Sequence, residues 1–259
     1  METQSIGFIG GGRITRIFLT AFMNASKTFL QILVFDPQES VLTALQSKFP
    51  IISISSTELE PAVGADIVFL AIHPPVMIDT MTKIKEFLKP DSILISLAPK
   101  LTIQKMSDVL GGFSNIARIN PSASSIINKG LNPVCFSPSM TKVKRSTILD
   151  LMEPLGSLPE ITEPKIEAYA MISAMGHTYF WPQLQKLKEL AVSFGMDEAE
   201  AKAVIGEMLN GTSETLFNSG LTYAEVVDLV PVKPLGEVES IINGYYDQYL
   251  TALFQKIKA

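Results

Sequence analysis

A group of glycines near the start of the chain offers the clearest chemistry. The apolar run Ile6 to Ile9 leads into three consecutive glycines, and an apolar and basic stretch from Arg13 to Leu19 follows them. A strand, a tight turn and a helix in this order expose bare backbone and the unpaired N–H groups of a helix N-terminus, which together suit a pyrophosphate. The pattern fits the dinucleotide fingerprint G-x-G-x-x-G/A with threonine in the third place. The residues that we expect to hold the pyrophosphate are Gly10, Gly11, Gly12, Arg13 and Ile14.

A carboxylate follows the second apolar run of the chain. This run, Ile32 to Phe35, ends at Asp36, and Pro37 comes next. An acidic side chain at the tip of the second strand accepts hydrogen bonds from the ribose hydroxyls of NAD and repels the 2′-phosphate of NADP. The next residue is also not an arginine that could hold that phosphate. The sequence therefore predicts NAD or NADP as cofactor and favours NAD.

Short apolar runs alternate with amphipathic stretches through the first half of the chain. Such alternation is typical of a doubly wound parallel sheet, which binds ligands at the carboxyl ends of its strands. The expected ligand edge therefore includes the residues that follow the strands: Gly10, Asp36, His73, Ala98 and Asn120. The expected strands are 6–9, 32–35, 51–54, 65–72, 92–97, 115–119, 131–136 and 156–161, and the expected helices include 40–48, 76–88, 103–110 and 142–153.

The pattern becomes entirely helical after about residue 160. We expect one helix over 162–194, kinked near Pro182, and further helices over 197–218, 223–230 and 237–257. The fold class is thus α/β, a Rossmann-type domain over 1–160 followed by an all-helical domain over 161–259. Apolar residues such as Phe217, Leu221 and Val226 are too numerous for a few helices to bury within one chain, which predicts a homodimer formed through the C-terminal helices.

Composition excludes several classes of partner and site. The chain has 259 residues, is 47% hydrophobic and 18% charged, and carries a net charge of −5, so nucleic acid is not an expected partner. It contains neither a membrane-spanning apolar run nor a secretory leader, and we expect a cytoplasmic protein with no membrane partner. Cys135 is the only cysteine, which excludes an internal disulfide and a cysteine-based metal cluster. No metal site is expected.

Five short motifs, in order along the chain, resemble those of the pyrroline-5-carboxylate reductase family. The family patterns are IGFIGxGxM, AVKPQ, RxMPN, SGSGPAY and the helix pair GLPR…G. Their counterparts here are Ile6-Gly-Phe-Ile-Gly-Gly-Gly-Arg-Ile14, Ala71-Ile-His-Pro-Pro75, Arg118-Ile-Asn-Pro-Ser122, Ser173-Ala-Met-Gly-His-Thr-Tyr179, and Gly195-Met-Asp197 with Gly211. The resemblance covers nearly the whole chain.

The resemblance implies an NAD(P) domain, a helical domain that dimerises by intertwining, and an active site where the two meet. It implies that Ala71, His73, Pro74 and Asn120 line the cofactor and that Ser173 helps to bind the substrate carboxylate. It further implies reduction of a C=N bond in proline biosynthesis.

The chain departs from the family in its catalytic loop. The family sequence SPGGTT places a threonine hydroxyl near the substrate imine, whereas Val230-Pro-Val-Lys-Pro-Leu235 retains only the first proline. A proton donor must then come from elsewhere, and His177 is our candidate for the general acid. The alternative is that His177 is a helix-surface or interface residue. Thr178 could add a hydroxyl and Lys233 a cation for an acidic substrate; otherwise they are a helix hydroxyl bonded to its own chain and a solvated lysine.

These observations predict an oxidoreductase of the pyrroline-5-carboxylate reductase type. It would use NAD(P) to transfer a hydride to a small imine, or carbonyl compound, that carries a carboxylate. One alternative is an enzyme like the F420-dependent NADP oxidoreductases. A second alternative is a non-catalytic dinucleotide-binding sensor or structural dimer.

Overall fold

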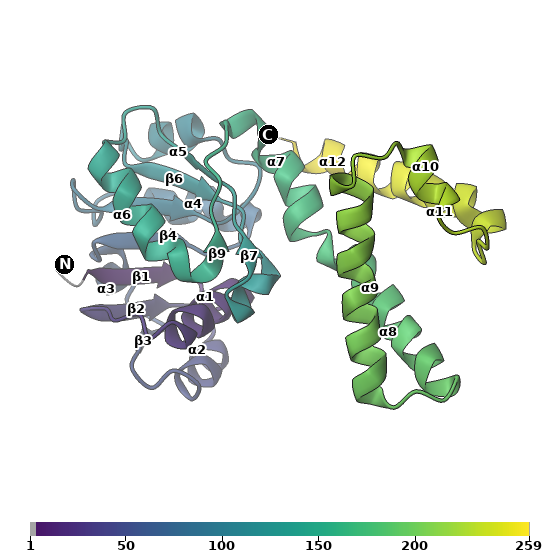
Figure 1. Ribbon diagram of the computed structural model, residues 1–259. Coiled ribbons are helices and arrows are strands. Elements are labelled where there is room, and N and C mark those ends of the chain that lie inside the picture. The colour runs from purple at the N-terminus through teal and green to yellow at the C-terminus, as the bar shows by residue number, and fades with distance from the viewer. Residues whose placement is uncertain (1–3, 259) are drawn as a thin grey trace. The chain divides into compact units, whose positions relative to one another are not determined.

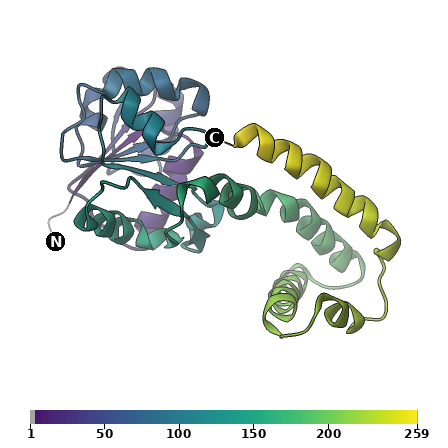
Figure 2. The same ribbon diagram turned by 90° about the horizontal axis from the view of Figure 1, so that it is seen from above.

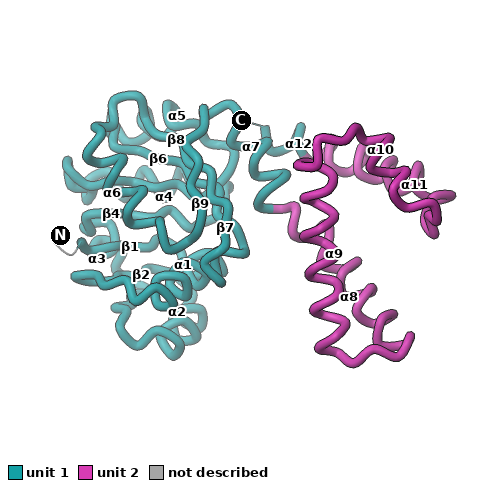
Figure 3. Tube along the Cα trace, viewed as in Figure 1, with its two compact units in different colours: residues 1–174, 254–259 teal, residues 175–253 magenta. Residues whose placement is uncertain are grey.

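The computed structural model describes residues 4–258. The chain forms two compact units, which are coloured separately in Figure 3. The first contains residues 1–174 together with 254–259, and the second contains residues 175–253. Figure 1 labels the elements of both.

A seven-stranded sheet forms the centre of the first unit. Its strand order is β3-β2-β1-β4-β5-β6-β8. Every neighbouring pair from β3 to β6 is parallel, and β8 is antiparallel to β6. This order and the parallel pairing confirm the predicted Rossmann-type sheet. The strands are β1 (Ser5–Ile9), β2 (Gln31–Phe35), β3 (Ser53–Ser55), β4 (Ile67–Leu70), β5 (Ile93–Ser96), β6 (Ile116–Ile119) and β8 (Val134–Phe136).

Helices cover both faces of the sheet, as the view from above shows (Figure 2). Neighbouring strand residues therefore enter different cores: Phe8 and Phe69 belong to one apolar cluster, and Ile9 and Val68 belong to the other. Burial on both faces explains why these strands are continuous apolar runs. The helices are α1 (Arg13–Asn24), α2 (Glu39–Gln46), α3 (Glu60–Val63), α4 (Pro74–Ile84), α5 (Ile103–Val109), α6 (Lys142–Met152) and α7 (Ile166–Tyr169).

Shorter elements connect the sheet to the last helices of this unit. A single strand over 131–136 was expected, but the chain forms β7 (Gly130–Leu131) and then β8, because Pro133 between them has no N–H for a ladder. The strand β9 (Gly156–Ser157) pairs with β7. The remaining turns are η1 (Ala123–Ile127), η2 (Glu153–Leu155), η3 (Glu163–Lys165) and the π-helical turn η4 (Ala170–Ala174).

The predicted single helix over 162–194 is wrong. The structure divides this stretch into η3, α7, η4 and α8 (His177–Ser193), and Pro182 lies inside α8. The interruption falls at Met175 and Gly176, where a π-helical turn is followed by glycine, which is a poor helix former.

The second unit is helical throughout its length. The helix α8 ends near Gly195, whose φ of 104° reverses the chain, and α9 (Glu198–Asn218) begins with a capping box formed by Asp197 and Glu200. The two helices lie side by side (Figure 1). Within residues 175–253, all of which are described, only Gly176 and Ala201 are buried. The other elements are α10 (Tyr223–Asp228), η5 (Gly236–Val238), α11 (Glu239–Tyr245), the π-helical turn η6 (Tyr246–Leu250) and α12 (Thr251–Ile257), which ends in the first unit.

Candidate functional site

The first glycine of the turn after β1 has no room for a side chain. Gly10 has a φ of 106°, and a Cβ built on it would lie 2.4 Å from the carbonyl oxygen of Ala71. Its N–H donates to the carbonyl of Phe35 at 2.7 Å, and the N–H of Ala71 donates to the carbonyl of Ile9 at 2.8 Å. Close packing between β1, β2 and β4 thus requires glycine at this position.

The third glycine of the turn faces open space. Gly12 is the N-cap residue of α1, no side chain caps this helix end, and a Cβ on Gly12 would meet nothing within 4 Å. The buried hydroxyl of Thr15 donates to the Gly10 carbonyl at 2.6 Å and so stabilises the turn. Bare backbone at an uncapped helix N-terminus is an arrangement that binds phosphate groups.

The carboxylate of Asp36 joins the end of β2 to the glycine turn. Its Oδ2 accepts from the N–H of Gly11 at 2.9 Å, and its Oδ1 accepts from the N–H of Gln38 at 2.9 Å. Asp36 is half-buried at the tip of the second strand. The side chain that could select the ribose therefore also stabilises the glycine turn.

A groove of about 370 Å³ runs beside the turn, between α1 and α2. Its charged lining residues are Arg13, Arg16 and Lys48, and no acidic side chain lines it. Sequence analysis had identified only Arg13, although Arg16 follows it at the spacing of one helical turn. A groove with three cations beside an uncapped helix N-terminus has the charge needed for an anionic ligand.

The turn after β4 carries His73. This residue is exposed and is the N-cap of α4, but its side chain makes no capping hydrogen bond. Its carbonyl accepts from the N–H of Val76 at 3.2 Å, and Pro74 occupies the first turn of the helix, where a missing N–H costs little. The structure thus leaves the imidazole of His73 at the carboxyl edge of the sheet.

Asn120 follows β6 and is buried. Its side-chain amide donates to the carbonyl of Ile166, and its N–H donates to the carbonyl of Pro133 at 3.1 Å. The expected cofactor residue at the end of β6 therefore also binds the start of α7.

The expected substrate residues lie on the helices that follow. Ser173 belongs to the first unit, and its hydroxyl donates to the carbonyl of Tyr169 at 2.8 Å. His177 opens α8 in the second unit, where its ring stacks on Trp181 with 5.6 Å between centroids. The hydroxyl of Thr178 donates to the carbonyl of Met175 at 2.7 Å.

A buried ion cluster is the main feature that sequence analysis missed. Arg118 on β6 is 1% exposed, and its guanidinium contacts Glu163, at 3.0 Å, and Glu167, at 2.5 Å. The signal was present: an arginine inside an apolar strand needs buried partners, and the two glutamates stand four residues apart. Cys135 on β8 lies opposite Arg118 in the antiparallel pairing of β6 with β8. Burial raises the pKa of its thiol to about 12, as expected of a core residue rather than a nucleophile.

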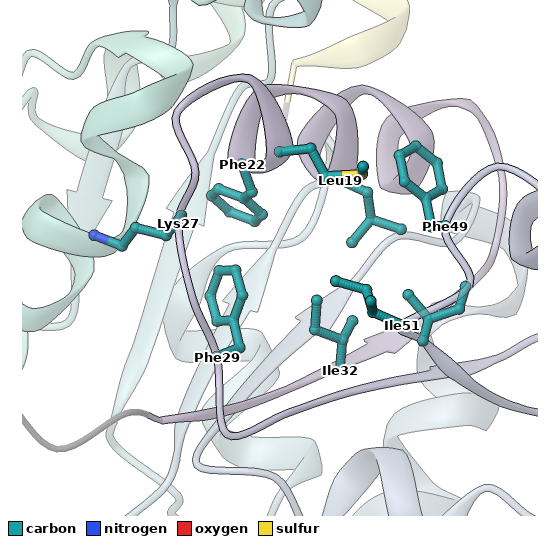
Figure 4. Close-up of a pocket in the computed structure, with 9 residues that line it drawn as sticks. Leu19, Phe22, Lys27, Phe29, Ile32, Phe49 and Ile51 are labelled. Carbon is teal, nitrogen blue, oxygen red and sulfur yellow. The ribbon is translucent and has the colours of Figure 1, made fainter.

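A second pocket is apolar and small. Figure 4 shows it between the later half of α1 and the start of β2, with Phe22 and Phe29 facing each other. The amine of Lys27 points away from it and donates to the carbonyl of Asp150 at 2.7 Å. The space admits about one water molecule, 10 Å³, which is far too little for a nucleotide.

Among residues 4–258, no helix is long and apolar enough to cross a membrane. No group of three or more histidine, cysteine, aspartate or glutamate side chains among them is arranged to hold a metal ion.

Comparisons with known proteins agree with this geometry. The family model for NADP oxidoreductase, coenzyme F420-dependent, matches residues 5–100. A pyrroline-5-carboxylate reductase of Escherichia coli is 26% identical over 88% of this chain and 84% of its own length. One of Methanosarcina acetivorans is 22% identical over 98% and 94%. The fold matches a crystal structure of Plasmodium falciparum pyrroline carboxylate reductase with NADP bound, with a TM-score of 0.82, 20% identity and coverage of 100% and 98%.

Proposed function

The chain is a divergent relative of the pyrroline-5-carboxylate reductase family, and from this premise we propose that it is an NAD(P)-dependent oxidoreductase acting on a C=N bond. Its substrate would be a small imine, or carbonyl compound, that carries a carboxylate. The observation that carries the proposal is the glycine turn: Gly10 admits no side chain, and Gly12 opens bare backbone at the N-terminus of α1. This is what a dinucleotide pyrophosphate requires.

The proposed cofactor site extends from the glycine turn along the carboxyl edge of the sheet. Backbone from Gly10 to Ile14 would bind the pyrophosphate, with Arg13 adding a charge, and Asp36 would bind the adenosine ribose. Ala71, His73, Pro74 and Asn120 would line the nicotinamide side. When bound, the nicotinamide supplies the hydride.

Two side chains, Ser173 and His177, would bind the substrate carboxylate and supply the proton. The Ser173 hydroxyl would donate a hydrogen bond to the substrate carboxylate instead of to the carbonyl of Tyr169. Reduction of an imine carbon leaves a nitrogen that must carry a proton, and His177 would provide that proton as general acid. Exchanging His177 for glutamine should lower kcat about a hundredfold while cofactor affinity stays constant. A fully active His177→Gln enzyme would remove this histidine from the mechanism.

We propose NAD as the preferred cofactor. The Asp36 carboxylate supports NAD because it would repel a 2′-phosphate. The cations Arg16 and Lys48 in the adjacent groove would attract a 2′-phosphate and so favour NADP. Titrations of the protein with NADH and NADPH show which cofactor binds more tightly. Tighter binding of NADPH would contradict the proposed preference for NAD.

We propose that the helical unit forms a homodimer. Phe194 and Phe217 are 80% and 76% exposed, and Trp181 is 53% exposed. Apolar side chains in such number require a covering surface, and a second copy of the same helices would offer a self-complementary one. Sedimentation equilibrium tests this directly.

The test of the function is oxidation of NADH and NADPH in the presence of pyrroline-5-carboxylate, with cofactor binding titrated in parallel. Turnover supports the reductase. Tight cofactor binding without turnover on any imino acid supports the sensor alternative. Turnover that depends on F420 supports the other enzyme; the match to that family model covers only residues 5–100, which contain the glycine turn and strands β1 to β5.

A further inference from the structure

A buried arginine joins the last parallel strand to the segment that bears Ser173. The Nη1 of Arg118 lies 3.0 Å from Oε1 of Glu163, and its Nη2 lies 2.5 Å from Oε1 of Glu167. The Nε of Arg118 is buried and has no hydrogen-bond partner within residues 4–258. Two carboxylates from one short segment therefore hold a positive charge that has been withdrawn from water.

Further bonds reinforce the same junction. The Oε1 of Glu163 also accepts from the N–H of Ile103 at 2.7 Å, and the side chain of Asn120 donates to the carbonyl of Ile166. Glu163 in η3 and Glu167 in α7 stand four residues apart, and both side chains contact Arg118. The two ion contacts, together with the bond from the Asn120 side chain to the Ile166 carbonyl, fix both the position of α7 and its rotation about its own axis.

Stability alone is a poor reason for such a cluster. Buried ion pairs and triads can often be replaced by apolar residues of similar volume without loss of stability, whereas removing one partner is strongly destabilising. A planar guanidinium bonded to two carboxylates restricts the relative placement of its members more narrowly than an apolar contact of similar size. Here the cluster joins strand β6, which carries Arg118, to the segment that carries Glu163 and Glu167 and continues to Ser173.

We propose that Arg118 is a positioning residue that sets Ser173 against the nicotinamide turn. The strand β6 ends at Asn120, and the helix anchored on that strand continues through η4 to Ser173, about two turns beyond Ile166. An error in rotation at the anchor would be carried along the helix to the Ser173 hydroxyl. The inference rests on the proposed function, because that function assigns Ser173 to the substrate and Asn120 to the cofactor.

The decisive variant removes every charge of the cluster at once. In Arg118→Met/Glu163→Gln/Glu167→Met, no charge stays buried, and the glutamine still accepts from the N–H of Ile103. We expect a folded enzyme with cofactor affinity within about twofold of wild type but with kcat reduced about tenfold or more, since small misplacements of reacting groups are costly. A folded variant with kcat and KM within about twofold of wild type would overturn the proposal.

A milder pair of variants provides the matched control. Arg118→Lys keeps the charge but replaces the planar fork by a point charge that cannot hold both carboxylates in one geometry. Arg145→Lys makes the same change at an ion pair with Glu160, 2.8 Å long, near the surface of α6. We expect reduced kcat only for Arg118→Lys. Equal kinetics of the two variants would contradict a positioning role.

Amide hydrogen exchange tests whether Arg118 anchors this helix, and it requires no enzymatic activity. Exchange of residues 166–174 should accelerate about tenfold or more in Arg118→Lys, while the amides of β1 and β4 stay protected. If the wild type reduces no imine, the proposed function fails, but the exchange still decides whether Arg118 anchors this helix. Unchanged exchange would overturn the anchor even in an active enzyme.

Discussion

Residues 1–174 enclose an apolar core on each face of their sheet, whereas residues 175–253 bury only Gly176 and Ala201. The first unit pairs its strands and buries its two apolar clusters within one chain, although some large apolar side chains such as Val143 stay exposed. The second places Phe194 and Phe217 outward. The stability of the first unit is therefore a property of the single chain. We infer that the stability of the second depends on association and hence on concentration.

The same contrast separates the two halves of the proposed reaction. The glycine turn, Asp36 and the groove beside α1 all belong to the first unit, so cofactor binding should not require a dimer. His177 belongs to the second unit, so the proposed proton transfer should require the dimer.

The largest effect is expected from a charge placed on the outer surface of α9. Phe217→Asp should raise the dimer dissociation constant at least a hundredfold, because a carboxylate would have to be desolvated at the interface. Analytical ultracentrifugation measures the mass, and fluorescence of Trp181, the only tryptophan, reports on the helical unit. The control is Val143→Asp at an equally exposed position on α6, 75% exposed. If both variants leave the mass unchanged, the contrast between the units is wrong.

The next effect lies inside the first unit. Gly10→Ala should destabilise the protein by about 3 kcal/mol, because the new methyl group meets the Ala71 carbonyl at a backbone conformation that alanine rarely adopts. Gly12→Ala should destabilise the protein by only about 1 kcal/mol or less, since its Cβ would face open space and only the N-cap preference for glycine over alanine is lost. It should nevertheless weaken dinucleotide binding about tenfold or more. Urea unfolding and cofactor titration separate the two effects, and equal stability losses would refute this account of the turn.

A smaller effect is expected at Asp36. Asp36→Ala removes the acceptor for two backbone N–H groups and should cost about 1–2 kcal/mol of stability. It should also weaken NAD binding and relax discrimination against NADP. Asp36→Asn retains one acceptor oxygen and should fall between alanine and wild type in unfolding experiments. Unchanged affinities for both cofactors would remove Asp36 from the site.

The smallest effect concerns the thiol in the first unit. Burial raises the pKa of Cys135 from 9.0 to about 12. Between these values the unfolded chain loses this proton while the folded chain keeps it, so folding stability falls as pH rises through that window. The stability difference between wild type and Cys135→Ala should therefore narrow above pH 9. A constant difference would show that the thiol is not held in a dry core.

Much of the dinucleotide-binding unit was determined by the sequence alone. Alternating apolar runs predicted the strands of the parallel sheet, and the glycine spacing predicted the turn that Gly10 now forms. These features depend on side-chain periodicity and on backbone preferences within a few residues, and both can be read directly from a sequence.

Only the tertiary structure decided which distant residues meet. The partners of Arg118 lie 45 and 49 residues away; the sequence signals that this arginine needs buried partners, but it does not identify which acidic residues they are. The antiparallel direction of β8 and the contribution of Lys48 to the groove were also settled by packing. The reason is physical: a buried charge requires a partner, but the partner's identity depends on how the sheet and the helices pack together.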